Sequence, residues 1–145
     1  MACAESNVAV DNLLEGLTDL GIKAVRIGKP VKVRESLRNS TLDAIVDEHP
    51  AQEEIALIKQ ANDKLRKNLD KLKGKEKGLT HKEINNNFRE MRHIETQLLN
   101  TILDDAEVIC CTTIGAGHHV LGDRKFPIVI IDEATQASEP SALVP

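Results

Sequence analysis

Apolar residues recur at helical spacing through the middle of the chain, in two long segments of similar length. The first stripe is Ile55, Ile58, Leu65, Leu69 and Leu72, and the second is Ile84, Phe88, Met91, Leu98 and Ile102. Steps of three, four and seven residues place each set on one face of an α-helix. A charged run at 73–78 predicts the turn between the helices, and Thr80 with Glu83 predicts a capping box at the start of the second. Two such helices are expected to pack as an antiparallel hairpin.

The pattern on both sides of these helices is typical of a parallel α/β sheet. Residues 1–4 have the character of the end of a strand, and Ser6 and Asn7 are cap residues for a helix that ends at Gly21. A strand is predicted at 22–27, and a weaker helical pattern covers 33–48. The runs at 108–112 and 128–131 are apolar on both faces, as central strands of a parallel sheet are. The predicted fold class is α/β, with two long helices inserted into a partial parallel sheet.

Composition narrows the class of protein. Hydrophobic residues make up 41% and charged residues 29% of the 145-residue chain, which is ordinary for a globular protein. Phe88 and Phe126 are the only aromatic residues besides histidine, so a base-stacking platform of aromatic side chains is excluded. No apolar run approaches the roughly 20 residues that span a bilayer, and the first residues lack a signal pattern. We expect a soluble protein of the cytoplasm or nucleus, without a membrane partner.

Charge is unevenly distributed along the chain. The formal net charge is −4, but residues 59–92 contain eleven Lys and Arg against five Asp and Glu. A solvated helix face is the ordinary explanation of such a segment. The sharper one is contact with nucleic acid or an acidic protein partner, through the lysines of the predicted hairpin: Lys64, Lys67, Lys71, Lys73, Lys75 and Lys77.

Cysteine and histidine spacing gives no sign of a metal site. No C-x-x-C or H-x-x-x-H arrangement occurs. Cys110 and Cys111 are adjacent on a predicted strand and point to opposite faces, so they are not expected to bridge each other. The three cysteines are expected to be buried thiols, and His118 and His119 to be loop residues.

The local signal with the most chemical content is at 128–133, where four aliphatic residues are followed by Asp132 and Glu133. This order places two carboxylates at the carboxyl end of a strand, where open α/β sheets bind ligands. Nucleotide hydrolysis uses one carboxylate to hold Mg²⁺ and a second to orient or deprotonate the attacking water. A strand that merely ends in solvated acids is the competing interpretation.

Three segments in order sharpen the choice. Residues 3–11 (CAESNVAVD), 108–117 (VICCTTIGAG) and 132–140 (DEATQASEP) resemble motifs Ia, Ic and II of superfamily-one helicases, in the branch of the nonsense-mediated decay helicase and senataxin. The family's motif Ia usually reads Ala-Pro-Ser-Asn, and Glu5 stands here in place of the proline. The family also inserts a two-helix stalk between motifs Ia and Ic. The resemblance therefore implies a RecA-like sheet in residues 1–50 and 104–145, with the stalk in 51–103.

The resemblance also implies roles for individual residues. Asp132 would hold Mg²⁺ through water, Glu133 would be the catalytic base, and Gln136 would sense the γ-phosphate of ATP. Four residues would face single-stranded RNA or DNA through hydroxyl and amide contacts: Ser6, Asn7, Thr112 and Thr113. Simpler interpretations are that Asn7 only caps a helix and that Thr112 is only a strand residue.

The sequence has no G-x-x-x-x-G-K-[ST] loop, which binds the β- and γ-phosphates and lies before motif Ia in the family. We therefore expect the parent protein to be an ATP-dependent helicase and this polypeptide alone to be inactive. The alternative from another class is a non-enzymatic module that binds nucleic acid or protein. A third reading, a purely structural coiled-coil hairpin, leaves the two β-prone runs unexplained.

Overall fold

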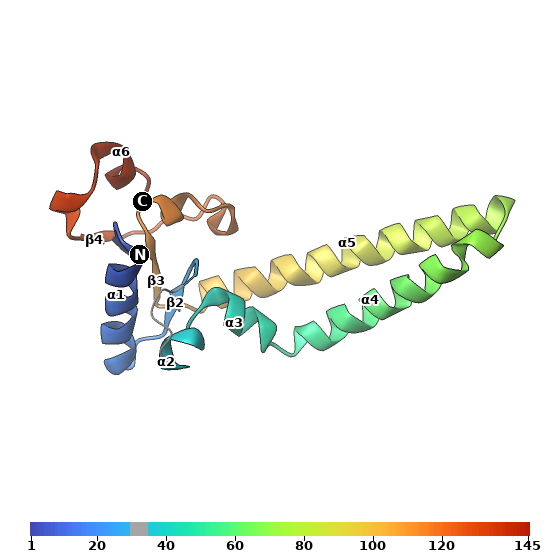
Figure 1. Cartoon of the computed structure of the whole chain (residues 1–145), viewed down its shortest axis with the longest axis horizontal. Helices are drawn as coiled ribbons and strands as arrows, with labels where there is room; N and C mark the ends of the chain where they lie inside the picture. The colour runs from blue at the N-terminus through green and yellow to red at the C-terminus, as the bar shows by residue number, and fades with distance from the viewer. Residues whose placement is uncertain (30–34) are drawn as a thin grey trace. The chain divides into compact units, whose positions relative to one another are not determined.

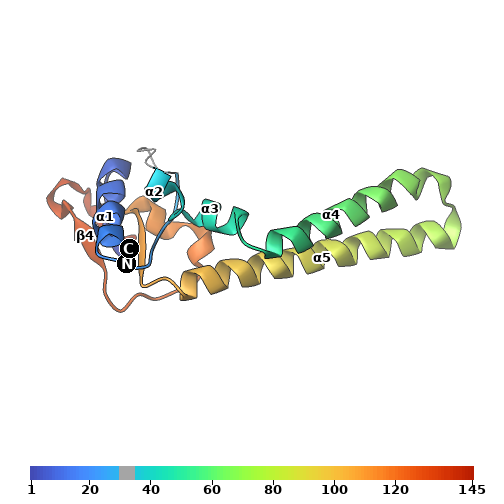
Figure 2. The ribbon, with the colours of Figure 1, turned by 90° about the horizontal axis from the view of Figure 1, so that it is seen from below.

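The structure is a computed structural model that describes residues 1–29 and 35–145. The chain divides into two compact units. One comprises Met1–Asp47 and Thr101–Pro145, and the other comprises Glu48–Asn100. The first unit contains a parallel sheet, and the second is helical (Figures 1 and 2).

Four parallel strands form the sheet, in the order β2-β3-β1-β4. The strands are β1 (Ala2–Ala4), β2 (Ala24–Arg26), β3 (Val108–Thr112) and β4 (Ile130–Asp132). Helix α1 (Asn7–Asp19) connects β1 to β2, as parallel strands require a crossover rather than a tight turn. The predicted α/β class with a parallel sheet is confirmed.

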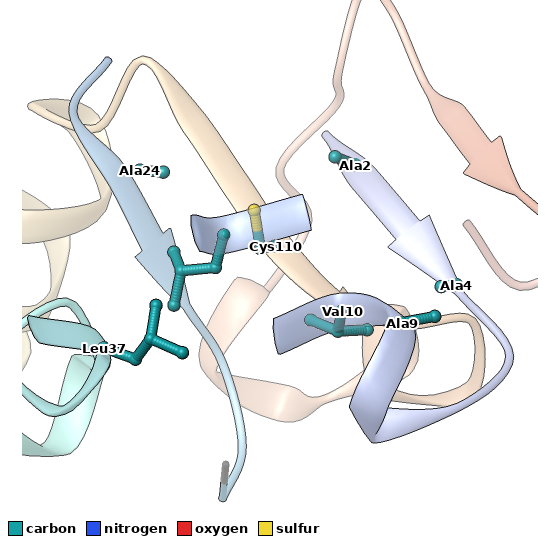
Figure 3. Packing of buried hydrophobic residues seen from close by; sticks show 8 residues of the cluster. Ala2, Ala4, Ala9, Val10, Ala24, Leu37 and Cys110 are labelled. Atoms are coloured by element: carbon teal, nitrogen blue, oxygen red, sulfur yellow. The ribbon is translucent and has the colours of Figure 1, made fainter. Parts of the chain in front are cut away.

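The core of this unit is built from small side chains on the strands and larger ones on the helices. Ala2 and Ala4 of β1 and Cys110 of β3 are buried against Val10 and Leu14 of α1. Figure 3 shows this packing, to which Leu37 contributes from α2 (Glu35–Arg38). Because alanine and cysteine are short, the helix approaches the sheet closely without needing aromatic side chains.

The segment 128–131 is not the buried central strand that its composition predicts. Strand β4 lies at an edge of the sheet and pairs only with β1. Ile128 is 68% exposed and Ile130 is 60% exposed. A run of aliphatic residues reports a preference for burial, whereas burial itself depends on which elements pack on the strand. By contrast β1, predicted only as a strand end, is central and fully buried.

The helix predicted over 33–48 is also wrong in its extent. Residues 33 and 34 lie outside the described part of the chain, and the remainder forms α2 and α3 (Leu42–Asp47). The break occurs at Ser40 and Thr41, where the Ser40 carbonyl accepts a hydrogen bond from the Arg26 amide. The backbone is therefore paired with β2 at a point where a continuous helix would have to satisfy its own groups.

The helical unit contains α4 (Ala51–Asn68), the short 3₁₀ helix η1 (Leu69–Lys71) and most of α5 (Gly74–Asp104). Helices α4 and α5 lie side by side in both views (Figures 1 and 2). The turn predicted at 73–78 is wrong, since α5 begins at Gly74. Thr80 does not cap this helix, because its hydroxyl donates to the Glu76 carbonyl one turn earlier, at 3.0 Å. Gly74 has φ +56°, so the reversal needs this residue and no longer run.

The remaining elements follow β3 and β4. They are the 3₁₀ helices η2 (Ile114–Gly117), η3 (His119–Leu121) and η4 (Ala134–Gln136), and the short helix α6 (Glu139–Ala142). Within residues 1–29 and 35–145, no helix is long and apolar enough to cross a membrane.

Candidate functional site

Strand register brings the three sequence motifs to one edge of the sheet. Ala4 of β1 is level with Thr112 of β3 on one side and with Asp132 of β4 on the other. Because all three strands are parallel, the loops after them leave from the same carboxyl edge. This edge is where open α/β sheets bind ligands.

The predicted catalytic carboxylates lie side by side in sequence at the end of β4, and both are exposed. The Asp132 carboxylate accepts a hydrogen bond from the Glu133 amide at 3.0 Å. Gln136 lies one turn later in η4, and its amide donates to the Glu133 carbonyl at 2.8 Å. Asp132, Glu133 and Gln136 are therefore parts of one short, locally hydrogen-bonded turn.

Glu133 has an unusual backbone conformation. Its φ of 53° and ψ of 37° lie in the left-handed region, and among the described residues it is the only non-glycine residue with a positive φ. Such a conformation costs of order 1–3 kcal/mol and tends to occur at functional sites. The strain marks the residue to which the family resemblance gives the role of catalytic base.

A hollow of about 340 Å³ lies beside Asp132, lined otherwise by Asn12, Gly16 and three leucines of α1. The Asp132 carboxylate is the only acidic group in this lining, and the described residues contain no group of three or more His, Cys, Asp or Glu side chains that could hold a metal ion. An exposed single carboxylate fits a magnesium ion held through water, since Mg²⁺ keeps most of its waters and takes few protein ligands. It does not fit a metal cage built only from protein side chains.

Ser6 and Asn7 each use one oxygen within the protein. The Ser6 hydroxyl oxygen accepts a hydrogen bond from the Ala9 amide at 3.1 Å and caps α1. The Asn7 amide oxygen accepts from the Arg26 guanidinium at 2.9 Å. Both side chains are exposed. Their donor groups, the Ser6 hydroxyl hydrogen and the Asn7 amide nitrogen, are the parts with which they would contact a ligand.

Thr112 and Thr113 differ more than their sequence suggests. The Thr112 hydroxyl oxygen accepts from the Gly115 amide at 3.0 Å and remains half-buried. Thr113 is completely buried, and its hydroxyl donates to the Glu5 carboxylate at 2.8 Å. The Ser141 hydroxyl donates to the same carboxylate oxygen at 2.9 Å. In this arrangement the Thr113 hydroxyl holds Glu5, and a nucleic-acid contact by Thr113 stays a prediction.

Glu5 and Ser141 were not recognised as partners from the sequence. Glu5 joins the loops that follow β1 and β3 to helix α6, which lies beyond the Asp132 turn. The carboxylate that replaces the family's proline thus has structural contacts of its own. The departure from the motif was visible in the sequence, but its partners lie 108 and 136 residues away along the chain.

A buried ion pair supports the same edge from below. Arg26 of β2 is 1% exposed and Asp11 of α1 is fully buried, and the Arg26 Nε donates to Asp11 Oδ1 at 2.7 Å. The same guanidinium also donates to Asn7, as described above, and to the Ile27 carbonyl at 3.3 Å. Arg26 therefore fixes the start of α1, where two of the predicted ligand contacts lie. An arginine in a short strand pattern was the only sequence signal.

The three cysteines are buried and free, as expected. Cys3 and Cys111 are level on β1 and β3, and their sulfur atoms are 3.6 Å apart. Burial raises the pKa of the Cys110 thiol to about 11. His118 lies in the loop before η3, where its Nδ1 accepts from the Val120 amide at 3.3 Å.

Comparison with known proteins places this arrangement in a family. A family model described as an AAA domain matches residues 1–145. The ATP-dependent helicase NAM7 of Saccharomyces cerevisiae is 39% identical over 145 residues, covering all of this chain and 13% of that protein. The DNA polymerase alpha-associated DNA helicase A of Schizosaccharomyces pombe is 33% identical over 146 residues, covering all of this chain and 22% of that protein.

A third relative is named for nucleic-acid binding. The DNA-binding protein SMUBP-2 of Mesocricetus auratus is 32% identical over 157 residues, covering all of this chain and 15% of that protein. The chain thus spans between 13% and 22% of the length of these three relatives. It belongs to the AAA-domain family and, within it, to the superfamily-one helicases related to NAM7 and SMUBP-2.

Proposed function

We propose that this chain is part of the motor core of an ATP-dependent helicase, which couples ATP hydrolysis to movement along single-stranded RNA or DNA. The observation that carries the proposal is the register of Ala4 with both Thr112 and Asp132. It places the acidic turn and the loops proposed to contact nucleic acid on adjacent strands of one sheet. A change at one loop then has a short structural route to the other.

Within this proposal each residue has one task. Asp132 holds Mg²⁺ through water, and the ion neutralises charge on the phosphates of ATP. The Glu133 carboxylate accepts a proton from the attacking water, and the left-handed backbone fixes its direction at the end of β4. Gln136 follows in the same turn and reports the state of the nucleotide to neighbouring parts of the protein.

The nucleic-acid contacts in the proposal are made by short polar groups. Ser6, Asn7 and Thr112 lie at the ends of β1 and β3 and offer hydroxyl and amide donors to phosphate and sugar. Such contacts read no base sequence, which suits a protein that moves along a strand. Asn7 is held by Arg26 through its oxygen, so its amide nitrogen is directed by a buried contact.

The decisive experiment compares Glu133→Gln with Glu139→Gln in the longer protein that contains this chain. Removal of the base should lower nucleic-acid-stimulated ATP turnover by about 100-fold or more while nucleotide binding persists. Glu139, an exposed acid at the start of α6, provides the matched control and should leave turnover unchanged. Equal turnover in both variants would remove Glu133 from the catalytic role.

The 145-residue chain by itself is proposed to be inactive, because its sequence lacks a phosphate-binding loop. Isothermal calorimetry should detect no micromolar binding of ATP, and a phosphate-release assay should detect no turnover. Micromolar binding with turnover would contradict this part of the proposal.

A non-enzymatic interaction module is the second candidate. It is favoured by the exposed aliphatic residues of β4 and by the excess of basic residues in 59–92. It would gain if Glu133→Gln left all measurable functions of the longer protein intact.

A further inference from the structure

Two hollows flank the Phe88 ring in the helical unit. One, of about 260 Å³, lies between α4 and α5 and is lined by residues that include Arg66, Met91 and Phe88. The other, of about 320 Å³, is lined by Asn85, Arg89, Arg92 and the same Phe88. Phe88 is half-buried, so the ring forms a wall shared by both hollows. We refer to the two hollows and their lining as the Phe88 site.

The lining of the Phe88 site is cationic. Lys59, Arg66, Arg89 and Arg92 contribute four positive charges, and Asp63 contributes the single negative charge. All five side chains are exposed. The site therefore favours an anion, and three of its four cations are arginines, which pair with phosphate in a planar, bidentate geometry.

The Phe88 site also offers one flat surface. The Arg66 guanidinium lies over the Phe88 ring, 5.1 Å from its centroid. A ring covered by a mobile guanidinium is a place where a planar group can stack, either on the ring or on the guanidinium itself. A single ring of this kind is one stacking position and not the aromatic platform that the composition excludes.

A buried amide at the same place lacks a hydrogen-bond partner. Asn62 lines the smaller hollow, is 3% exposed, and accepts a hydrogen bond from the Asn87 amide through its Oδ1 at 2.8 Å. Its Nδ2 has no partner among the described residues. A buried donor without an acceptor is costly, so native proteins keep few of them. An acceptor on a bound ligand would satisfy this donor if the Arg66 side chain moved aside.

We propose that the Phe88 site binds single-stranded nucleic acid, with a base stacked at Phe88 and Arg66 and phosphates held by Arg89 and Arg92. Phosphate answers the positive charge, the base answers the flat surface, and a base carbonyl or ring nitrogen answers the Asn62 donor. The identity of the ligand rests on the proposed function, but the site is separate from the sheet edge to which that function is assigned.

This proposal selects different residues from those that the sequence pattern singled out. The lysines near the helix connection, such as Lys75 and Lys77, are exposed and line neither hollow. They act as solvated charges in this proposal. They therefore provide a control that matches the change in charge but not the change in site.

The test measures fluorescence anisotropy of a labelled twelve-nucleotide oligouridylate with the full 145-residue chain over a range of salt concentrations. Arg89→Glu with Arg92→Glu should weaken binding at least tenfold and lower the salt slope by about 2, one unit per lost phosphate contact. Lys75→Glu with Lys77→Glu should weaken it less than threefold. Far-UV circular dichroism establishes that each variant keeps its helix content.

A second comparison isolates stacking from charge. Phe88→Leu keeps an apolar side chain and all four cations, and should weaken binding of the oligouridylate at least fivefold. An abasic strand of equal length should bind the wild type and Phe88→Leu equally. Loss of discrimination by both strands alike, or equal weakening by the two charge-reversed pairs, would overturn the site.

The outcomes also separate this site from the proposed function. If only Asn7→Ala at the sheet edge weakens binding, the Phe88 site is refuted and the helicase proposal stands. If binding is weakened only at Arg89 and Arg92, the Phe88 site stands and the sheet-edge contacts fail. If the chain binds a polyglutamate peptide but no oligonucleotide, and charge reversal at Arg89 and Arg92 abolishes that binding, an acidic protein partner replaces the proposal.

Discussion

Asparagine in place of Asp11 should destabilise the sheet unit strongly. The substitution keeps the size of the side chain but removes the negative charge that faces the buried guanidinium of Arg26. Asp11 is fully buried and Arg26 is 1% exposed, so water cannot replace the lost partner. Removing one member of such a pair typically costs 3–5 kcal/mol, roughly, because it leaves an uncompensated buried charge. With a denaturant slope of roughly 2 kcal/mol per molar, the urea midpoint should fall by about 2 M.

The cysteines provide an assay that reports on the sheet unit alone. Cys3, Cys110 and Cys111 are all buried in that unit, and the helical unit contains none. Their reaction with a thiol reagent across a urea series therefore follows unfolding of the sheet. The control is Asp105→Asn, which breaks the 3.5 Å pair of Asp105 with Lys23, whose side chains are 63% and 62% exposed. An exposed pair of this kind contributes less than about 1 kcal/mol.

The reasoning fails if Asp11→Asn and Asp105→Asn shift the midpoint equally, or if Asp11→Asn costs less than about 1 kcal/mol. A companion double variant, Asp11→Leu with Arg26→Met, replaces both charges by apolar groups. Because pairs of this kind often gain nothing over well-packed apolar residues, the double variant should recover much of the loss. It should still perturb Asn7, whose amide oxygen loses its donor.

Two further predictions concern α5 and the pH dependence of stability. Gly78→Ala should raise the thermal stability of the helical unit by about 0.5–1 kcal/mol, since Gly78 lies inside α5 and a Cβ there meets nothing within 4 Å; Gly74→Ala should lower it, because φ is +56° there, and equal shifts in circular-dichroism melts would contradict the helix start. Burial raises the pKa of Cys110 to about 11, so its contribution to stability is complete below the pKa of the unfolded thiol and is lost as pH rises towards the folded value. At about 1.4 kcal/mol per pKa unit, urea midpoints should fall by the equivalent of roughly 3 kcal/mol over this range, and Cys110→Ala should show a shallower fall. Parallel slopes for the two proteins would show that another group is responsible.

Helices with a long apolar stripe were predictable, but their ends were not. The stripe on α5 is buried at Ile84, Met91, Leu98 and Ile102, as the spacing indicated. Asn62 is buried on α4 as well, which no hydrophobic pattern could reveal. Helix ends depend on single backbone conformations, such as the positive φ of Gly74, and a run of charged residues does not specify them.

The site was predictable in its motifs and less so in its contacts. The order of three short segments was sufficient to identify the family, because each carries several residues at fixed spacing. The partners of Glu5 and Arg26 were not predictable, since Ser141 is 136 residues from Glu5 and Asp11 is 15 residues from Arg26. Hydrogen bonds of this kind depend on which strands become neighbours, and residue spacing does not encode that.

The sequence by itself determined the α/β class, the two long helices, the absence of an aromatic platform and the acidic turn at Asp132 and Glu133. Each of these is a local property, set by periodicity or by neighbouring residues. Only the tertiary structure decided that β1 is central and β4 is at the edge, that Thr113 is turned inwards to Glu5, and that Asn62 lies unpaired beside Phe88. Burial and pairing are properties of the packed arrangement, because the same side chain is stable inside or outside according to what lies against it.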